Sequence, residues 1–318
     1  MSPQSTTMSV FLLETTHVVP FFTCKPMHQL GVGLHAFSTR LGGVSGAPYT
    51  SLNMGFGSGD RRVCVLRNRA RFTQAVGINP DDLTTLRQVH GNQVCVLTKA
   101  NAGTLVQGTP GDGLITNRAA LPLGVITADC FPVVIAAPSV PAVGILHAGR
   151  KGAATRVVPA AIALMCQAFD LAPEAVFAAI GPGIGGCCYE VDEANANPFL
   201  TGFAADTAVY WPSRPGHVYL DLQQALLLQL HAAGVPSSQM WAAGLCTACH
   251  PHWFYSYRRE GPRSGRMLNV VMIQPTPQLP PTHPTATVCH EGALLSKACR
   301  DVSLLPSSIT CRTPRSRG

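Results

Sequence analysis

The sequence predicts an α/β (α+β) fold: a single layered domain of mixed β-sheets flanked by helices. Short apolar runs bounded by Gly, Pro and Asn recur along the chain, which is typical of strands. Longer segments with apolar residues at helical spacing lie between these runs. The 318 residues are 46% hydrophobic and 12% charged, so the chain can bury a substantial core.

In the first half of the chain, one helix is expected among several strands. LGVGLHAFST predicts a strand, and VCVLRNRARFTQAVGI predicts a helix that ends at Gly77. DLTTLRQVHGNQVCVLT predicts two strands around a glycine turn. GDGLITN, PLGVITADCFPVVIAAP and AVGILHA predict further strands, and Pro132 is expected to stop regular pairing.

In the second half, helices and strands alternate. GAATRVVPAAIALMCQAFDL predicts a helix with a kink at Pro159. AVFAAIGPGI predicts a strand that runs into a glycine-rich loop, and LDLQQALLLQLHAAGV predicts an amphipathic helix. MWAAGLCTA and GRMLNVVMI predict two late strands.

Three regions are expected along the chain. Residues 1–16 predict a flexible N-terminal extension, and residues 17–273 contain all the elements above. Residues 274–318 begin with a run rich in Pro and Thr, which favours a disordered tail. Within that tail, EGALLSKACRDV has the composition of a short helix.

Composition also narrows the class of protein. The formal net charge is +7, but the basic residues are dispersed, so nucleic-acid binding is not expected. No apolar run is long enough to predict a membrane span, and the first residues lack the features of a secretory signal. The 12 cysteines are therefore expected to be mostly free thiols in a cytoplasmic protein.

Three residues that can bind a metal stand at predicted strand-to-loop junctions. His90 lies in QVHGNQV, Cys130 ends GVITADC, and His147 ends AVGILHA. Two imidazoles and a thiolate can hold Zn²⁺ with its fourth position open, which is the arrangement of a catalytic site. The spacing equally fits a buried structural cysteine and two hydrogen-bonded histidines.

Polar neighbours extend this candidate site. Asp129 precedes Cys130, where its carboxylate could orient a ligating imidazole. The motif HAGRKG places two cations at a predicted helix start, which suits an anion, although a solvated basic loop has the same composition. Arg40 lies beside a glycine pair in FSTRLGG, where either a ligand or a surface ion pair fits.

Taken in order, a series of motifs resembles one protein family. The motifs are HAFSTRLGGVSGAPYTSLNMG, QVHGNQV, TADCFPVV, HAGRKG, AAIGPGIGGCCYEV and CTACHPHWFYSYRREGPRSGRM. The series closely resembles the YfiH-like family of purine nucleoside phosphorylases, formerly described as multicopper polyphenol oxidases or laccase-domain proteins. The resemblance implies a YfiH-like fold for residues 17–273 as the catalytic domain. It also implies a zinc ion bound by His90, Cys130 and His147.

The resemblance further implies the reactions. These are phosphorolysis of adenosine, inosine, guanosine and methylthioadenosine, together with deamination of adenosine. Purine nucleosides and phosphate are then the partners of a monomer or homodimer. One departure matters, because many family members have HAGWRG where this chain has Arg150 and Lys151 in HAGRKG. Lysine offers a point charge without the planar fork of arginine, so phosphate geometry is expected to differ here.

Roles for individual residues follow as hypotheses. Arg40, Arg150 and Lys151 are the expected substrate- or phosphate-binding residues. Arg40 and Asp129 are the expected catalytic residues, with Glu190 as a second acid–base candidate.

Two other functions stay open at this point. A laccase needs several coppers and many imidazoles, whereas this chain has 11 histidines and one His-x-His pair, in HPH. If the chain is nevertheless a laccase, copper takes the place of zinc as the bound metal. A non-catalytic adaptor that keeps the metal site and recruits partners through its Pro-rich tail is the other alternative.

Two further sequence patterns are weaker evidence for a function. GPGIGG matches the glycine spacing of dinucleotide-binding turns, but no helix is predicted after it, so a loop lining the pocket is favoured. CTACH matches a haem-attachment pattern that an export signal would have to accompany. A second metal could instead be held by Cys246, Cys249, His250 and His252. The favoured interpretation is that these are ordinary thiols on a late strand and turn, because no second ligand pair follows at the spacing of a zinc finger.

Overall fold

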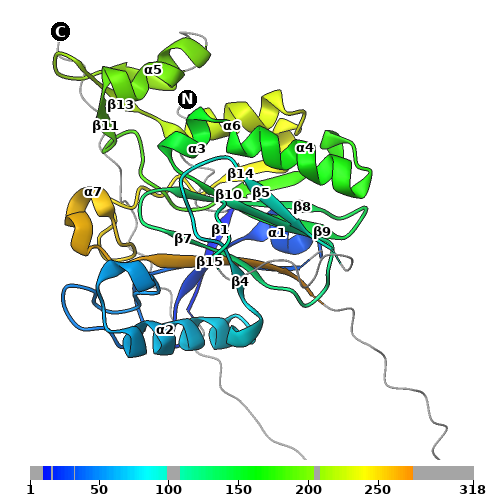
Figure 1. The fold of residues 1–318 in the computed structure, drawn as a ribbon, viewed down its shortest axis with the longest axis vertical. Coiled ribbons are helices and arrows are strands. Elements are labelled where there is room, and N and C mark those ends of the chain that lie inside the picture. The colour runs from blue at the N-terminus through cyan, green and yellow to red at the C-terminus, as the bar shows by residue number, and fades with distance from the viewer. Residues whose placement is uncertain (1–9, 16, 32, 99–107, 204–207, 275–318) are drawn as a thin grey trace, which may run out of the picture.

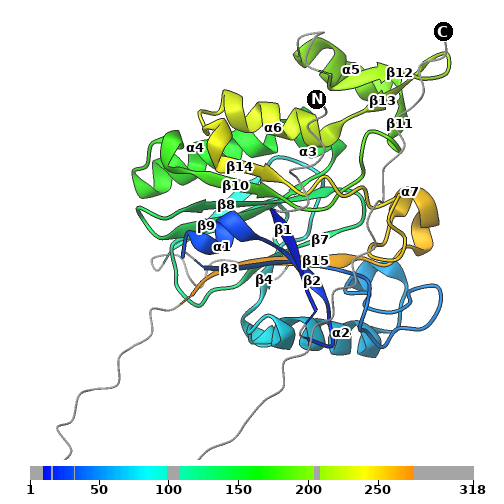
Figure 2. The same ribbon diagram turned by 180° about the vertical axis from the view of Figure 1, so that it is seen from behind.

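The computed structural model describes residues 10–15, 17–31, 33–98, 108–203 and 208–274. Two six-stranded sheets are stacked, and helices cover their outer sides (Figure 1). The view from behind shows the same order of layers, with α2 on one side and α3, α4 and α6 on the other (Figure 2). The expected class, a layered α/β domain with mixed sheets, is confirmed. The helices named are α2 (Arg62–Ala75), α3 (Arg150–Ala154), α4 (Val157–Phe169) and α6 (Leu222–Ala232).

The first sheet joins residues from both ends of the described chain. Its strand order is β1-β2-β3-β15-β7-β4, and β15 pairs antiparallel with both β3 and β7. The short β4 adds to β7 in parallel. The strands are β1 (Phe11–Glu14), β2 (Phe21–Cys24), β3 (Gly33–Ser38), β4 (Thr84–Thr85), β7 (Leu123–Thr127) and β15 (Met267–Ile273).

The second sheet carries the candidate site. Its order is β14-β10-β8-β9-β6-β5, with the β8–β9 hairpin at its centre. The pairs β14–β10 and β6–β5 are parallel, whereas the pairs between them are antiparallel. The strands are β5 (Val94–Leu97), β6 (Gly113–Thr116), β8 (Phe131–Ala137), β9 (Ala142–Ala148), β10 (Phe177–Ile180) and β14 (Met240–Ala242).

Side chains of the central strands alternate between the two faces of each sheet and so fill three apolar layers. On β8, Val133 and Ile135 pack in the cluster formed with α4 and α6, whereas Val134 packs between the two sheets. On β15, Val271 packs between the sheets, whereas Val270 packs in the cluster formed with α2. Because successive side chains of a strand point to opposite faces, sheets covered on both faces contain runs that are apolar at every position.

A small third sheet and three short helices complete the described structure. Sheet β11-β13-β12 is antiparallel, and α5 follows β11 directly. Its elements have weak sequence signals, and none of them was expected from periodicity. The elements are α1 (Lys25–Gln29), β11 (Glu190–Asp192), α5 (Glu193–Gly202), β12 (Tyr210–Pro212), β13 (His217–Leu220) and α7 (Tyr257–Glu260).

The structure corrects three local predictions. The helix expected at 152–171 is broken not at Pro159 but at Arg156, whose φ of 65° is left-handed and separates α3 from α4. Pro132 does not stop pairing, because it lies within β8 opposite His147. The two strands expected around the turn at Gly91 belong to different sheets.

The expected terminal regions lie mainly outside the described residues. Residues 1–9 of the N-terminal extension and 275–318 of the Pro-rich tail, with its candidate helix, are not described, so these boundaries stay predictions. Within the described ranges, none of the helices is both long and apolar enough to span a bilayer.

Candidate metal centre

The β8–β9 hairpin brings two of the three candidate ligands to the same edge of the second sheet. Pro132 pairs with His147, and Phe131 pairs with Ala148. Cys130 comes immediately before Phe131, so its thiol lies beside the C-terminal end of β9. Antiparallel pairing thus makes neighbours of residues that are far apart in sequence.

The third candidate ligand is held in place by a buried carboxylate. Asp112 accepts hydrogen bonds from the backbone amides of Val89 (3.2 Å), His90 (2.9 Å) and Gly91 (2.7 Å). His90 itself has a left-handed φ of 60°, a conformation that needs such support. Asp112 therefore fixes the turn that presents the His90 ring.

The same carboxylate also orients His147. His147 Nδ1 lies 2.8 Å from Asp112 Oδ1, so Nδ1–H donates to the carboxylate and Nε2 is left for a metal. Burial alone raises the pKa of Asp112, but hydrogen bonds from His147 and the Gly91 and Val89 amides hold it below its usual value. The sequence predicts that Asp129 orients an imidazole, but the carboxylate in contact with the His147 ring is that of Asp112.

The three side chains converge. Their ligand atoms lie within 4.8 Å of one another, and Cys130 Sγ is 3.9 Å from His90 Nδ1. The His90 and His147 ring centroids are 4.7 Å apart. Tetrahedral coordination with bonds of about 2.0–2.3 Å places ligand atoms about 3.3–3.8 Å apart, so small side-chain shifts close this group around one ion.

The Cys130 thiolate and the His147 imidazolium stabilise each other. Burial disfavours the Cys130 thiolate, but His147 and His90 outweigh burial and lower the pKa of Cys130 to about 6. Burial likewise disfavours the His147 imidazolium, yet Cys130 and Asp112 raise the pKa of His147 to about 9. A bound Zn²⁺ ion would take the place of the His147 proton at Nε2 and would be held by a thiolate and two imidazoles, a donor set that fits Zn²⁺.

Gly149 leaves space that two of the candidate ligands, Cys130 and His90, occupy. A Cβ atom at this position would lie 2.7 Å from Cys130 Sγ and 3.0 Å from His90 Nδ1. Its φ of −86° is open to any residue, so the requirement for glycine here is steric. The glycine of the HAG motif thus lets the backbone pass close to the candidate ligands.

Tyr189 lies within electrostatic range of the Cys130 thiol and of two arginines. The pKa of Tyr189 is raised, first by burial and also by the charge of Cys130, while Arg150 and Arg258 act against this rise. The Arg258 guanidinium stacks 5.2 Å from the Tyr189 ring centroid. Arg150 donates from Nη1 to the carbonyl of Asn195 at 3.1 Å. Positive charge from separate segments therefore gathers around Tyr189, on which the charge of Cys130 also acts.

A third arginine approaches from β15. Arg266 directly precedes this strand. Burial lowers the pKa of its guanidinium, and the charges of Tyr257, Asp129 and Cys130 offset part of this lowering. Asp112, Tyr189, Arg258 and Arg266 were not among the predicted site residues. The position of Asp112 between two glycines and the arginine-rich run SYRREGPRSGRM are the signals that could have drawn attention to them.

Asp129 acts within the loops that surround the site. Its carboxylate accepts hydrogen bonds from Thr247 Oγ1 and from the Arg258 amide, both at 2.6 Å. Burial raises its pKa, although these hydrogen bonds act in the opposite direction. Both carboxylate oxygens are thus engaged with neighbouring segments.

Arg40 is firmly held by partners within the chain. Its Nη1 pairs with Glu260 at 2.8 Å, its Nε donates to the Thr50 carbonyl at 3.1 Å, and its guanidinium lies 4.4 Å from the Tyr255 ring centroid. The ion pair that was the alternative for Arg40 is therefore present.

The remaining candidates differ in their surroundings. Lys151 is exposed on α3, next to Arg150. Glu190 accepts hydrogen bonds from Ser213 and Arg214 on the third sheet. This places the Glu190 carboxylate among polar partners of β12 and the following turn. GPGIGG forms a loop after β10 that is followed by β11, as its interpretation as a loop predicted.

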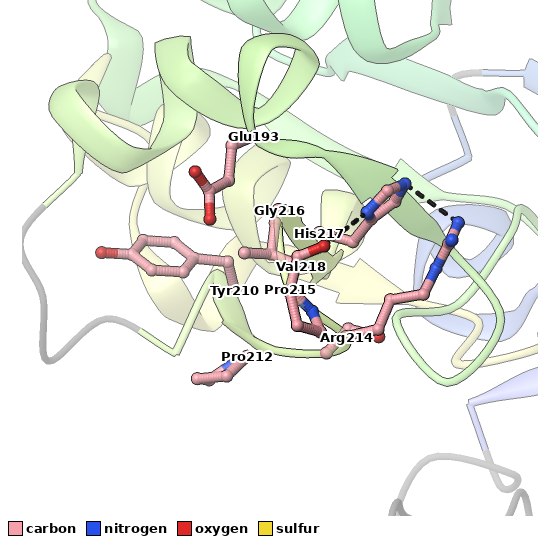
Figure 3. Close-up of a pocket in the computed structure, with 9 residues that line it drawn as sticks. Glu193, Tyr210, Pro212, Arg214, Pro215, Gly216, His217 and Val218 are labelled. Carbon is pink, nitrogen blue, oxygen red and sulfur yellow. Dashed lines mark hydrogen bonds between the residues drawn. The ribbon is translucent and has the colours of Figure 1, made fainter.

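A surface pocket of about 380 Å³ lies on the third sheet, and Ser213 and Arg214 are among its lining residues (Figure 3). It is lined by the third sheet and the start of α5, and His217 in its wall contacts Arg214 and the Pro215 carbonyl. None of its lining residues belongs to the His90, Cys130 and His147 group, so we do not place the chemistry there.

The second candidate metal group differs from the one that the sequence suggested. Cys246 and Cys249 do gather with two other ligands, but these are Cys187 and Cys188. His250 Nδ1 donates to the Cys246 carbonyl at 2.8 Å.

Comparison with known proteins identifies related chains. Residues 34–274 match the family described as "Multi-copper polyphenol oxidoreductase laccase". Purine nucleoside phosphorylase YlmD of Geobacillus stearothermophilus is 37% identical over 237 residues, which cover 73% of this chain and 86% of YlmD. A purine nucleoside phosphorylase of Deinococcus radiodurans is 40% identical, with 74% of this chain and 88% of the relative covered.

A solved structure gives the same picture. The crystal structure of YlmD from Geobacillus stearothermophilus superposes with a TM-score of 0.77 at 33% identity. The match covers 84% of this chain and 99% of that structure.

Proposed function

Because the chain belongs to the YfiH/laccase-like family and its relatives are named purine nucleoside phosphorylases, we propose that it is a zinc-dependent purine nucleoside phosphorylase. It cleaves adenosine, inosine, guanosine or methylthioadenosine with phosphate to give the base and a pentose 1-phosphate. It also deaminates adenosine to inosine and ammonia.

The number of imidazoles in the candidate metal groups favours this function over copper oxidation. Within the described residues, those groups are His90–Cys130–His147 and a cluster of four cysteines. Together they contain two imidazoles, whereas a laccase-type copper cluster requires many more. A single centre with three ligands and an open position suits a Lewis-acid reaction.

The residues around the centre have distinct tasks. His90, Cys130 and His147 bind the ion, and Asp112 holds His147 in the tautomer that leaves Nε2 available. A bound Zn²⁺ ion supplies Lewis acidity at its open position. Asp112 also keeps the His90 turn in place, so one carboxylate sets the direction of two ligands.

Phosphate requires cations near the reacting bond. Arg150, Arg258 and Cys130 all act electrostatically on Tyr189, and the Arg258 guanidinium lies 5.2 Å from its ring centroid. We assign them to phosphate binding, with Lys151 as an exposed neighbouring charge. Tyr189 offers an aromatic face for the purine.

Two predicted catalytic residues receive positioning roles in this proposal. Asp129 accepts from Thr247 and Arg258, so it positions the Arg258 segment beside the site. Arg40 braces the Glu260 segment through its ion pair. The protein is further proposed to work in the cytoplasm as a monomer or homodimer.

The test measures products. Purified protein is incubated with adenosine or inosine, with and without phosphate, and the bases and pentose 1-phosphate are quantified by chromatography. We expect phosphate-dependent release of adenine and hypoxanthine, and inosine from adenosine. His147→Ala should reduce phosphorolysis at least about 100-fold because it removes a ligand, whereas His231→Ala, at an exposed position on α6, should leave it unchanged.

Two results would contradict the proposal. Zinc-loaded protein that forms no base from any of the four nucleosides would favour the adaptor. Several copper equivalents per chain, together with oxygen consumption on a diphenol, would favour the oxidase.

A further inference from the structure

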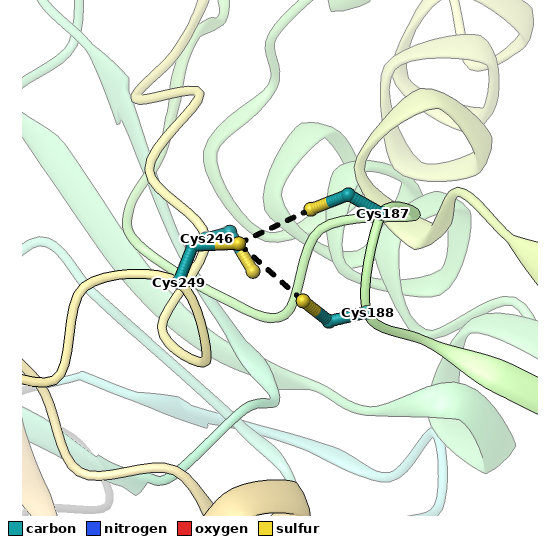
Figure 4. Close-up of side chains that lie close together, drawn as sticks. All are labelled: Cys187, Cys188, Cys246 and Cys249. Atoms are coloured by element: carbon teal, nitrogen blue, oxygen red, sulfur yellow. Dashed lines mark hydrogen bonds between the residues drawn. The ribbon is translucent and has the colours of Figure 1, made fainter. Parts of the chain in front are cut away.

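Four cysteine side chains converge outside the His90–Cys130–His147 centre (Figure 4). Cys187 and Cys188 come from the loop that follows β10, and Cys246 and Cys249 come from the loop that follows β14. We propose that these four residues, the cysteine cluster, bind a structural Zn²⁺ ion that ties the two loops together.

The geometry of the cysteine cluster fits one ion. Cys249 Sγ lies 3.5 Å from Cys187 Sγ and 3.4 Å from Cys188 Sγ, and all four sulfur atoms lie within 4.8 Å of one another. A tetrahedral site with Zn–S bonds of about 2.3 Å separates the sulfurs by about 3.8 Å. Both separations from Cys249 Sγ are well beyond the length of about 2.05 Å that a disulfide bond has.

The backbone brings the two loops together without help from the ion. Strands β10 and β14 are parallel neighbours, and the pairing continues beyond them as a bridge between Gly183 and Cys246. The Thr247 amide donates to the Gly183 carbonyl at 2.9 Å. Each loop then contributes two cysteines to the same space, so little chain entropy is lost when an ion binds.

The loop backbone closes around the sulfur atoms. Amides of Gly185 and Cys249 donate hydrogen bonds to the Cys246 sulfur. A Cβ atom on Gly185 would lie 3.2 Å from Cys187 Sγ and 3.5 Å from Cys246 Sγ. Amide donors and a close backbone are what support thiolate ligands around a bound metal.

The ligand set selects a structural zinc ion. Four thiolates complete a tetrahedral shell and leave no position for water or substrate, in contrast to the centre with two histidines. Thiolate sulfur favours Zn²⁺ over Mg²⁺, Ca²⁺ or Mn²⁺, which prefer oxygen ligands.

The cysteine cluster acts on loops that touch the candidate active site. The Ile184 amide donates to the Asp129 carbonyl at 2.8 Å, and Thr247 Oγ1 donates to the Asp129 carboxylate. Asp129 directly precedes Cys130. An ion at the cysteine cluster therefore restrains two of the segments that pack against Asp129, those of Ile184 and Thr247.

The experiment counts zinc per chain by mass spectrometry after purification under reducing conditions. The full chain should hold about two zinc ions. His147→Ala and Cys249→Ser should each hold about one, and the double variant about none. Cys166→Ser, which changes a cysteine on α4 outside the cysteine cluster, should still hold about two.

Thermal unfolding gives a second readout that does not depend on activity. Cys249→Ser should unfold at a lower temperature than the Cys166→Ser control. A melting temperature equal to that of the control would overturn the structural role.

If Cys249→Ser does not fold, the folded His147→Ala variant carries the test. Titration with a mercurial thiol reagent in the presence of a zinc-sensitive dye should release about one zinc ion per chain. No release, iron in place of zinc, or a mass lower by two hydrogens from a disulfide within the cysteine cluster would each overturn the proposal. Absence of phosphorylase activity would not affect these measurements, so the two proposals fail independently.

Discussion

At the scale of single residues, Asp112 connects more of the site than any ligand does. One carboxylate receives His147 Nδ1 and three successive backbone amides of the His90 turn. An asparagine in its place offers one oxygen acceptor, and its NH₂ group would face donors. The identity of this residue therefore controls both the direction of His147 and the shape of the turn.

Replacing Asp112 gives a direct prediction. Asp112→Asn should lower the zinc affinity of the His90–Cys130–His147 centre about 10–100-fold, because the supporting hydrogen bonds are lost. Competition with a chelator of known affinity, followed through zinc-dependent phosphorolysis, measures the change.

The matched control is Asp170→Asn, at an exposed left-handed position after α4 where asparagine is well tolerated. Unchanged affinity in Asp112→Asn would mean that His147 binds the ion without its carboxylate partner.

The sequence indicates the ligands more readily than their supports. His90, Cys130 and His147 lie in motifs that can be recognised locally. Asp112 contacts the His90 turn and His147 across gaps of 20 residues or more, as its hydrogen bonds record. No periodicity encodes such contacts, because they depend on the order of strands in the sheet.

At the scale of elements, the loop between β9 and α3 packs directly against the candidate ligands. Gly149 stands at the start of α3, and its missing side chain leaves room for Cys130 and His90. The break at Arg156 then lets α4 turn across the sheet. Local sequence predicted a single helix here, because a left-handed arginine has no compositional signature.

A substitution at Gly149 tests this packing. Gly149→Ala should reduce the bound zinc by about one ion per chain and abolish phosphorolysis, because a methyl group 2.7 Å from Cys130 Sγ displaces the thiol. Circular dichroism should remain like that of the unaltered protein.

Gly46→Ala is the control, since nothing lies within 4 Å of the added carbon there. A Gly149→Ala protein with full zinc content would show that the hairpin edge yields to the added methyl group.

At the scale of the whole molecule, two stacked sheets between helices create three apolar layers. Their presence was predictable from the runs that became β8, β9 and β15, which are apolar at nearly every position. The strand order was not predictable, because β4 and β5 are adjacent in sequence but join different sheets. The third sheet escaped prediction because its short strands, EVD, YWP and HVYL, include charged residues, a proline and a histidine, so no apolar run marks them.

The layer between the second sheet and its helices should dominate stability. Ile135→Ala, at a fully buried position on β8, should lower the free energy of unfolding by about 2–5 kcal/mol through lost contacts and a cavity. Chemical denaturation measures this loss. Leu66→Ala, at a position 48% exposed on α2, should change it by less than about 1 kcal/mol. Equal effects at the two positions would contradict the layered core.

The hairpin that carries Cys130 and His147 has a consequence for how related chains can vary. Both residues stand at its open end, and a tight turn at 138–141 closes the far end. Extra residue pairs inserted at that turn lengthen the hairpin outward and leave the paired ends where they are. The interval between the cysteine and the histidine in a sequence can thus drift during evolution while their distance in space stays constant.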